Sequence, residues 1–481
     1  MLIPILFLAL SLRLIALNQS LWLDEAVQVW ASSLPLEQFF SQFLPGDFNP
    51  PLYYIFLHLW IKIFGIAELA IRLPSVILAV SSIFLMTKIM DLIQIRLKSK
   101  RLVILLLTTS PLHIYYSQEA RPYMLASFGV LFSFFYFLKL LQNLSWKNSF
   151  LLAIGFLIMS FSHFLTLLTI PIFMIFIILI VKNKAFLAPS QNGRSLKRLI
   201  FPFLVLGIFY SFYLPILKQQ LAATNVLTKN YPIWEQIIGG VDLKTILLLP
   251  IKFVLGRISF ENRIIYGFVA FISTLLYWGV VFTSLTNKPC AKLSLKKFFV
   301  YCLLFVPPII GFLISFKMPI FSYFRFFYLL PFFYLTIGIG IEGMKTEERR
   351  FKIGSILIIG NLIFSGIYLF NPNFHRENWK AMANWLYQEN KNQKPILIIS
   401  QIAKPFEYYD KYRSSIILIN APSDFNPRIL PETTEIFLVS YGLPIFDPED
   451  KIRTVLKDNG FRLVKGDSFN QVGVEKWQFL N

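Results

Sequence analysis

Long apolar runs, separated by short polar segments, follow one another along the first 370 residues of the chain. A helix needs about 20 apolar residues to cross the hydrocarbon core of a bilayer. Many windows reach that length, for example residues 199–217 and 297–316. The short alternating strands that build a membrane β-barrel are not seen in the sequence. The pattern therefore predicts a mainly α fold, a polytopic bundle of transmembrane helices.

We expect about eleven spans in this region. They run near residues 1–17, 67–92, 100–117, 121–141, 148–164, 165–182, 199–217, 263–286, 297–316, 323–343 and 351–370. The first segment lacks a basic start and a small-residue cleavage site, so we interpret it as a retained helix rather than a cleaved signal peptide. Residues 50–64 and 243–255 are apolar but too short to cross, and they suit helices that lie in the membrane interface.

The connections between the spans differ in charge, which predicts the orientation of the chain. Lys and Arg gather in four of them, near residues 88–101, 182–198, 288–297 and 345–352. With eleven spans all four lie on one side, which the positive-inside bias makes cytoplasmic. The external segments are then the loop 18–66, the corner 116–123, the loop 218–262 and the tail 371–481. We therefore expect a multi-pass protein of the inner (plasma) membrane.

The tail has a different pattern, in which short helical and strand segments alternate. Helical spacing covers residues 379–390, 406–412 and 448–459, and apolar strands cover residues 395–400, 415–419 and 435–439. Gly460 follows the last helix as a stop signal. This alternation predicts a partly parallel sheet. We expect two domains, a transmembrane domain over residues 1–370 and a small soluble α/β domain over 371–481, and we interpret the second as accessory because it carries no nucleotide-binding motif or catalytic triad.

The net charge of +20 does not indicate a nucleic-acid partner. Residues 371–481 hold 14 basic and 13 acidic residues, so the excess lies in the short loops of the transmembrane domain. Membrane lipids are the partners that this distribution predicts.

Two adjacent carboxylates, Asp24 and Glu25, come directly after the first apolar segment. Such a pair is costly within lipid but not at the water boundary. One carboxylate can take a proton from an attacking hydroxyl, while its neighbour raises its pKa or orients it. The same pair at the start of a helix would also complement the helix dipole. From these two residues alone, both interpretations stay open.

Basic residues in the external loop 218–262 run against the positive-inside bias. They are Lys218, Lys229, Lys244, Lys252 and Arg257. An anionic ligand such as a lipid phosphate would explain them, and so would contact with lipid headgroups or snorkelling. Arg325, at the external entrance of a span, is a further candidate because a guanidinium can bind two phosphate oxygens at once. Arg325, Arg257 and Lys218 are our candidates for a phosphate contact.

Three blocks of the sequence resemble the signatures of one family. Trp22-Leu23-Asp24-Glu25-Ala26 resembles the first-loop Asp-Glu signature of the protein O-mannosyltransferase-like glycosyltransferases, integral-membrane enzymes of the GT-C superfamily (family 39 and its bacterial relatives). Asn49-Pro50-Pro51-Leu52-Tyr53-Tyr54, followed by Arg72-Leu73-Pro74-Ser75, is similar to a further block of the family, with Asn49 where relatives often have His. Ser117-Gln118-Glu119-Ala120-Arg121-Pro122-Tyr123 is similar to a corner of a bacterial subgroup. The resemblance covers residues 1–175 well and is looser beyond them.

The resemblance implies the transfer of a monosaccharide, with inversion, from a polyprenyl-phosphate-linked donor to a hydroxyl acceptor outside the cytoplasmic membrane. The acceptor would be a protein, a lipid or a glycan. Asp24 would be the general base that activates it, with Glu25 as its close partner. Glu119, Arg121 and Tyr123 would shape the same pocket. Arg121 could also pair with Glu119, but the i, i+2 spacing then requires a turn.

His163 and His113 both fall near external ends of spans. Some GT-C enzymes carry a divalent metal, and a His with a carboxylate could hold one. A lone His at a helix end more commonly caps or packs. We therefore include His163 among the substrate-binding candidates, and we expect no cofactor and assign no metal ligand.

A lipid-linked sugar flippase or transporter is the main alternative, because charges at span ends would serve it too. Transporters often show internal repeats and broken helices at the middle of the membrane. The second half of this sequence does not repeat the first, and the candidate charges gather at the external surface. Both features favour surface chemistry by a glycosyltransferase.

Overall fold

The computed structural model describes residues 2–182, 195–230, 239–286, 294–411, 414–422, 425 and 434–479. Parts of three loops of the transmembrane domain, 183–194, 231–238 and 287–293, lie outside the described residues. They include some of the basic positions from which the orientation was predicted.

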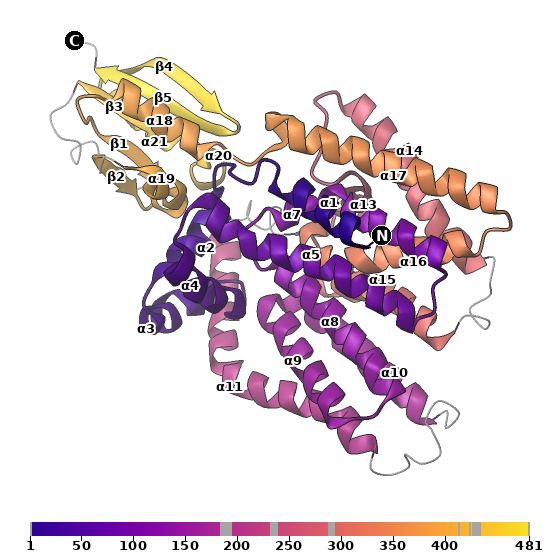
Figure 1. Ribbon diagram of the computed structural model, residues 1–481. Helices are drawn as coiled ribbons and strands as arrows, with labels where there is room; N and C mark the ends of the chain where they lie inside the picture. The colour runs from indigo at the N-terminus through magenta and orange to yellow at the C-terminus, as the bar shows by residue number, and fades with distance from the viewer. Residues whose placement is uncertain are drawn as a thin grey trace.

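Eight helices of the described part are long and apolar enough to cross a membrane. They are α5 (Glu68–Leu92), α8 (Tyr123–Gln142), η3 with α10 (Phe164–Thr169 and Ile170–Lys182), α11 (Ser195–Asn230), α14 (Arg263–Thr286), α15 (Leu295–Ile314), η7 with α16 (Tyr323–Leu329 and Leu330–Glu342) and α17 (Glu347–Phe370). The chain is a multi-pass membrane protein with the helical bundle that the sequence predicts (Figure 1).

Three of the eleven expected spans are shorter or broken. The first is α1 (Leu2–Leu14) and the fifth is α9 (Trp146–Ser162), both below the length of a full span. The expected span 100–117 is divided into α6 (Leu97–Thr108) and α7 (Pro111–Ser117). The cause of the break is local. The Ser110 side chain accepts a hydrogen bond from the backbone of His113 and caps a new helix. Pro111 follows in the first turn of this helix, where a backbone N–H would have no helical acceptor and its absence therefore costs no hydrogen bond.

The segment after α1, which the sequence predicts to be external, folds as a chain of short helices. They are α2 (Leu23–Ser33), α3 (Leu36–Gln38), η1 (Phe39–Phe43), η2 (Leu44–Gly46) and α4 (Leu52–Phe64). The short apolar helices predicted near 50–64 and 243–255 are both present, as α4 and as α13 (Leu243–Leu255). The expected loop 218–262 is shorter than predicted, because α11 continues to Asn230.

The core of the bundle forms around α16, whose residues from Leu330 to Glu342 are all buried. Glycine permits the close approach of α6 to this helix. A Cβ atom at Gly338 would lie 2.3 Å from Val103 Cγ2, far inside van der Waals contact. α6 and α7 therefore pack deep in the bundle, and the corner that follows α7 lies next to the start of α2.

The tail forms a five-stranded sheet with strand order β2-β1-β3-β5-β4. Its strands are β1 (Ile396–Ile399), β2 (Ile416–Ile419), β3 (Glu435–Val439), β4 (Phe461–Phe469) and β5 (Val472–Phe479). β2, β1 and β3 are parallel, as predicted, while β5 runs antiparallel to both β3 and β4. The helices are η8 (Pro372–Phe374), α18 (Trp379–Glu389), η9 (Ser400–Ile402), α19 (Lys404–Tyr409), α20 (Leu443–Phe446) and α21 (Lys451–Asp458).

The tail domain docks on one end of the bundle, beside α2 (Figure 1). The backbone N–H of Leu21 donates to the hydroxyl of Tyr409 at 2.8 Å, and the hydroxyl of Tyr408 donates to the carbonyl of Ile66 at 2.5 Å. Lys380 forms an ion pair with Glu68 at 3.0 Å. The domain thus holds the segments on both sides of α2 and α4.

Candidate active site

Asp24 and Glu25 lie in the first turn of α2, and each carboxylate has its own arginine. α2 begins at Leu23. Since a helix has 3.6 residues per turn, successive side chains point about 100° apart. Asp24 faces Arg121, and Glu25 faces Arg72. Both carboxylates also lie where the helix dipole favours negative charge.

Glu25 is completely buried and makes a two-bond ion pair with Arg72 of α5. Nε of Arg72 donates to Oε1 at 2.8 Å and Nη2 donates to Oε2 at 2.5 Å. The backbone N–H of Ala120 also donates to Oε1, at 2.8 Å. Burial raises the pKa of Glu25, but Arg72 and the other donors outweigh it, and the pKa lies below its ordinary value. Glu25 is therefore ionised, and it joins α2 to α5 and to the corner before α8.

Arg72 uses all five of its N–H groups. Besides the two bonds to Glu25, it donates to the backbone carbonyls of Leu17, Gln19 and Ser20, at 2.6–3.0 Å. These three carbonyls belong to the turn that connects α1 to α2. Arg72 therefore fixes the path of the chain into the helix that carries Asp24.

Asp24 is the accessible carboxylate of the pair. Its side chain is 39% exposed, and Oδ2 lies 3.1 Å from Nη2 of Arg121. Arg121 is almost buried and lies over the ring of Tyr123 at 5.8 Å. The sequence suggested Glu119 as a partner for Arg121, but the turn directs Arg121 to Asp24 instead. Asp24 is thus oriented by a fixed cation while it stays open to solvent.

Glu119 lies in the corner between α7 and α8 and pairs with Arg376. Its Oε2 accepts a hydrogen bond from Nη2 of Arg376 at 3.2 Å. Its Oε1 is buried and has no hydrogen-bond partner among the described residues. Burial raises the pKa of Glu119, Arg376 lowers it and Glu25 raises it, with a net pKa of about 7. Glu119 therefore titrates close to neutral pH.

His163 and Tyr123 continue the same cluster away from Asp24. Their rings lie 5.8 Å apart, and Nδ1 of His163 accepts a hydrogen bond from the backbone of Leu165 at 3.3 Å. His163 ends α9 and stands where the helix breaks before η3. The structure thus gives this residue the capping role that is common for a His at a helix end.

Of the three candidate phosphate contacts, Arg257 lies beside Tyr115, the residue on which Arg376 also stacks. Its guanidinium is exposed, lies 5.2 Å from the ring of Tyr115 and donates to the hydroxyl of Tyr323. Gly256 makes this position possible. It has a φ of +67°, and a Cβ there would lie 2.9 Å from that of Pro111. Arg257 is therefore a solvent-facing cation beside the buried helix α7.

Arg325 and Lys218 are placed differently. Nη1 of Arg325 donates to the carbonyl of Pro319 at 3.0 Å, and its guanidinium lies 5.8 Å from the ring of Phe324. Arg325 also lies close enough to His163 for its positive charge to influence the protonation of the imidazole. Lys218 is exposed on α11, and none of the described contacts joins it to the carboxylate cluster.

Two arginines of the cluster were missing from the sequence-based set of site residues. Arg72 had a signal, because a charged residue inside an expected span is costly unless it has a partner. Arg376 had none, because it lies in a polar linker more than 250 residues from Glu119 in the sequence. Its position in the site is seen only in the structure, where the tail domain docks on the bundle.

Metal ligands do not gather in the described part of the chain: no group of three His, Cys, Asp or Glu side chains there could hold a metal ion. Asp47, a further acidic residue close to Arg121, accepts a hydrogen bond from the hydroxyl of Tyr54 at 2.7 Å.

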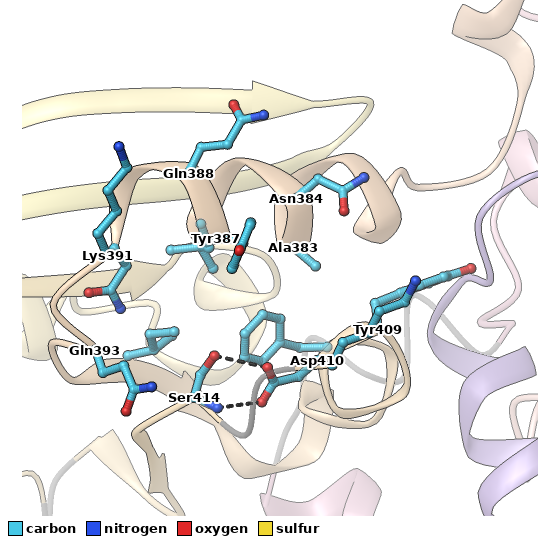
Figure 2. Close-up of a pocket in the computed structure, with 14 residues that line it drawn as sticks. Ala383, Asn384, Tyr387, Gln388, Lys391, Gln393, Tyr409, Asp410 and Ser414 are labelled. Atoms are coloured by element: carbon cyan, nitrogen blue, oxygen red, sulfur yellow. Dashed lines mark hydrogen bonds between the residues drawn. The ribbon is translucent and has the colours of Figure 1, made fainter.

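A separate pocket of about 470 Å³ lies within the tail domain (Figure 2). It opens between α18 and α19, where Asn384, Tyr387 and Asp410 form part of its wall. Its floor includes Ile396, the first residue of β1. Ligands of open parallel sheets bind at the carboxyl ends of the strands, whereas this pocket lies at an amino end. None of the predicted site residues lines it.

Comparison with known proteins places this arrangement in a known fold. No protein-family model and no curated protein sequence matches the chain. Among solved structures, ArnT from Cupriavidus metallidurans bound to undecaprenyl phosphate is 11% identical, with a TM-score of 0.57 over 98% of this chain and 97% of that chain. The archaeal oligosaccharyltransferase AglB from Archaeoglobus fulgidus, in complex with an inhibitory peptide and a dolichol-phosphate, is 11% identical, with a TM-score of 0.54 over 96% of this chain and 72% of that one.

The arabinofuranosyltransferase AftD from Mycobacteria is also similar, at 12% identity and a TM-score of 0.50, over 100% of this chain and 41% of that chain. At these identities the likeness is one of fold. It extends over both the helical bundle and the tail domain, because 98% of this chain aligns with ArnT. The chain therefore has the GT-C fold that its sequence predicts.

Proposed function

We propose that this chain is an integral-membrane inverting glycosyltransferase. It would move a monosaccharide from a polyprenyl-phosphate-linked donor to an acceptor hydroxyl on the extracytoplasmic side of the plasma membrane. The observation that carries the proposal is the exposed carboxylate of Asp24, held by buried Arg121 at one end of a GT-C fold.

Asp24 would act as the general base. Its carboxylate accepts the proton of the acceptor hydroxyl while that oxygen attacks the anomeric carbon of the donor sugar. The bond between the anomeric carbon and the phosphate oxygen breaks in the same displacement, and the polyprenyl phosphate leaves with both bonding electrons. A single displacement inverts the anomeric configuration. The ion pair with Arg121 fixes the orientation of the Asp24 carboxylate for the proton transfer.

Arg257 would stabilise the leaving phosphate. Charge develops on the phosphate as the sugar departs, and a fixed guanidinium lowers the free energy of that transition state. The geometry supports this role because Arg257 is exposed, yet it is held by Tyr115 and Tyr323. Lys218 and Arg325 remain candidates for contacts farther along the lipid, where charged side chains meet headgroups.

The class of donor is supported by the neighbours in fold. ArnT was solved with undecaprenyl phosphate and AglB with a dolichol-phosphate. A lipid phosphate of this kind would bring the sugar to the external rim of the bundle, where Asp24 and Arg257 lie. We propose a hydroxyl of a protein, lipid or glycan as the acceptor.

A transfer assay tests the proposal. Membranes containing the chain would be incubated with a panel of radiolabelled polyprenyl-phosphate sugars, and the labelled product would be isolated and its anomeric configuration determined by NMR. We expect label to move from one donor into a glycoside of inverted configuration. Label that crosses the membrane while it stays on its lipid would instead support a flippase.

A further inference from the structure

The first residues of the tail domain, directly after α17, place a single arginine among the site carboxylates. Nη2 of Arg376 donates to Oε2 of Glu119 at 3.2 Å and to the carbonyl of Tyr115 at 3.2 Å. Its Nε lies 3.8 Å from Oε2 of Glu25. The guanidinium stacks on the ring of Tyr115 at 4.4 Å, and its side chain is only 2% exposed. This one side chain therefore contacts both buried carboxylates of the site.

The residues that follow Arg376 join it to the fold of the tail domain. Glu377 accepts a hydrogen bond from the hydroxyl of Tyr441, in the tail domain, at 2.9 Å. Asp24 and Arg257 are both close enough to influence the charge of Glu377. The ring of Tyr441 lies 5.1 Å from that of Trp379, which is completely buried. Docking of the tail domain and insertion of Arg376 are thus one structural feature.

We propose that Arg376 is a positioning residue of the active site, through which the docked tail domain orients Glu119 beside Glu25 and favours its ionised form. The proposal rests on the proposed function, because it takes the ionised form of Glu119 as the one that serves transfer. It also gives the tail domain a role: without the domain, the cluster lacks the cation that faces Glu119.

Other groups around Glu119 cannot replace this cation. Arg121 is near, but it forms its ion pair with Asp24, and Arg72 is fully used by Glu25 and three carbonyls. The other charged group that faces Glu119 is the carboxylate of Glu25, which repels it.

Four tyrosine hydroxyls complete the surroundings of Glu119, from α4, α7 and α8. They belong to Tyr53, Tyr115, Tyr116 and Tyr123. They are neutral at pH 7 and supply no positive charge. Removal of Arg376 therefore raises the pKa of Glu119 further above its ordinary value, so that Glu119 is largely protonated at neutral pH.

The pH profile of transfer tests this role, with Arg376→Met and Arg376→Lys compared with the wild-type chain. An opposite charge at this distance changes a pKa by about one unit or more. We therefore expect the pH at which kcat reaches half of its maximum to rise by about one unit in Arg376→Met. Activity at pH 7 falls about fivefold, because a rise of one unit takes Glu119 from about half to about a tenth ionised, and it recovers at higher pH. Lysine keeps the charge and restores most of the profile.

Lys380→Met is the matched control. It removes the ion pair with Glu68, which also joins the tail domain to the bundle, but it leaves the carboxylates untouched. Its pH profile should be that of the wild type. An Arg376→Met profile that keeps its shape and falls only in proportion to the folded protein recovered would overturn the positioning role.

Thermal unfolding of the purified chain in detergent gives a readout that needs no substrate. Arg376→Met leaves the Glu119 carboxylate buried without its partner, so its unfolding midpoint should fall. Glu119→Gln added to Arg376→Met should recover part of that loss, because the unpaired charge is gone. Additive effects of the two substitutions would refute the coupling. Coupled unfolding together with an absence of transfer would instead refute the proposed function and leave the structural pairing standing.

Discussion

The ion pair of Glu25 with Arg72 allows a quantitative prediction, because both side chains are completely buried. At an effective dielectric constant of about 20, unit charges at their separations of 2.5 and 2.8 Å attract by roughly 6 kcal/mol. Desolvation offsets much of this attraction. Removing one partner of a buried pair typically costs about 3–5 kcal/mol, since the other charge is left without compensation.

Glu25→Gln isolates the contribution of this ion pair to the free energy of unfolding. Glutamine keeps the volume and one acceptor oxygen for Arg72, so we expect a loss near the lower limit, about 3 kcal/mol. For a chain of 481 residues this corresponds to a fall of about 3 °C in the unfolding midpoint. Arg72→Met should be more damaging, because the carbonyls of Leu17, Gln19 and Ser20 also lose their donor.

The assay is thermal unfolding in detergent at several pH values, with Glu37→Gln on the exposed helix α3 as the control. The pKa of Glu25 is depressed in the folded chain. The stability that its ionised form contributes is therefore present above its ordinary pKa and is lost as the pH falls through the depressed value. The difference in unfolding midpoint between the wild type and Glu25→Gln should be largest at pH 7 and should decrease as the pH falls. A Glu25→Gln midpoint equal to that of Glu37→Gln at pH 7 would refute the reasoning.

Three further predictions concern the phosphate contact, the orientation and the tail domain. Arg257→Gln should lower kcat about 100-fold, as expected for the loss of one transition-state contact, while Lys218→Gln should leave kcat unchanged. Steady-state kinetics with the donor would measure both, and equal effects of the two substitutions would count against Arg257. A reporter fused after residue 400 should report an external location, and a cytoplasmic signal would contradict the orientation. Trp477→Ala should destabilise the tail domain by about 3 kcal/mol, because Trp477 is 1% exposed in its core; limited proteolysis should then cleave the tail first, and wild-type resistance would contradict its central place in that core.

The apolar pattern was sufficient to predict the bundle, because a membrane leaves helices few alternatives. It was insufficient where a span is interrupted. Residues 102–107 are apolar throughout and residues 111–116 are mostly apolar, yet the Ser110 cap followed by Pro111 divides the stretch into two helices. The cap is a local hydrogen bond that hydropathy does not register, although Ser before Pro is a known signal for a helix start.

The strand pair β4–β5 was missed for a different reason. In β5 the buried residues Val472, Val474 and Trp477 do not alternate strictly with polar ones, and β4 is mostly exposed. The turn between them has Asn470 and Gln471 at positive φ, 42° and 78°. Asn is a recognised residue for such turns and could have indicated the hairpin, but Gln is not.

The candidate site divides in the same way. Asp24, Glu119 and Arg121 come from short motifs whose residues stay close in space, so the sequence could predict that they lie together. Arg376 reaches Glu119 only because the tail domain docks on the bundle, and no local pattern encodes that contact. The partner of Arg121 was also decided by the turn at Pro122, which a spacing argument alone does not determine.

Transfer by Asp24→Asn, measured beside Glu37→Gln with the donor found active for the wild type, tests the central claim most directly. Asparagine keeps the volume of Asp24 and removes its basicity. We predict that kcat falls by about 10²–10⁴-fold, the range for loss of a general base, while Glu37→Gln transfers sugar at the wild-type rate. Transfer by Asp24→Asn at the wild-type rate would contradict the assignment of Asp24 as the base.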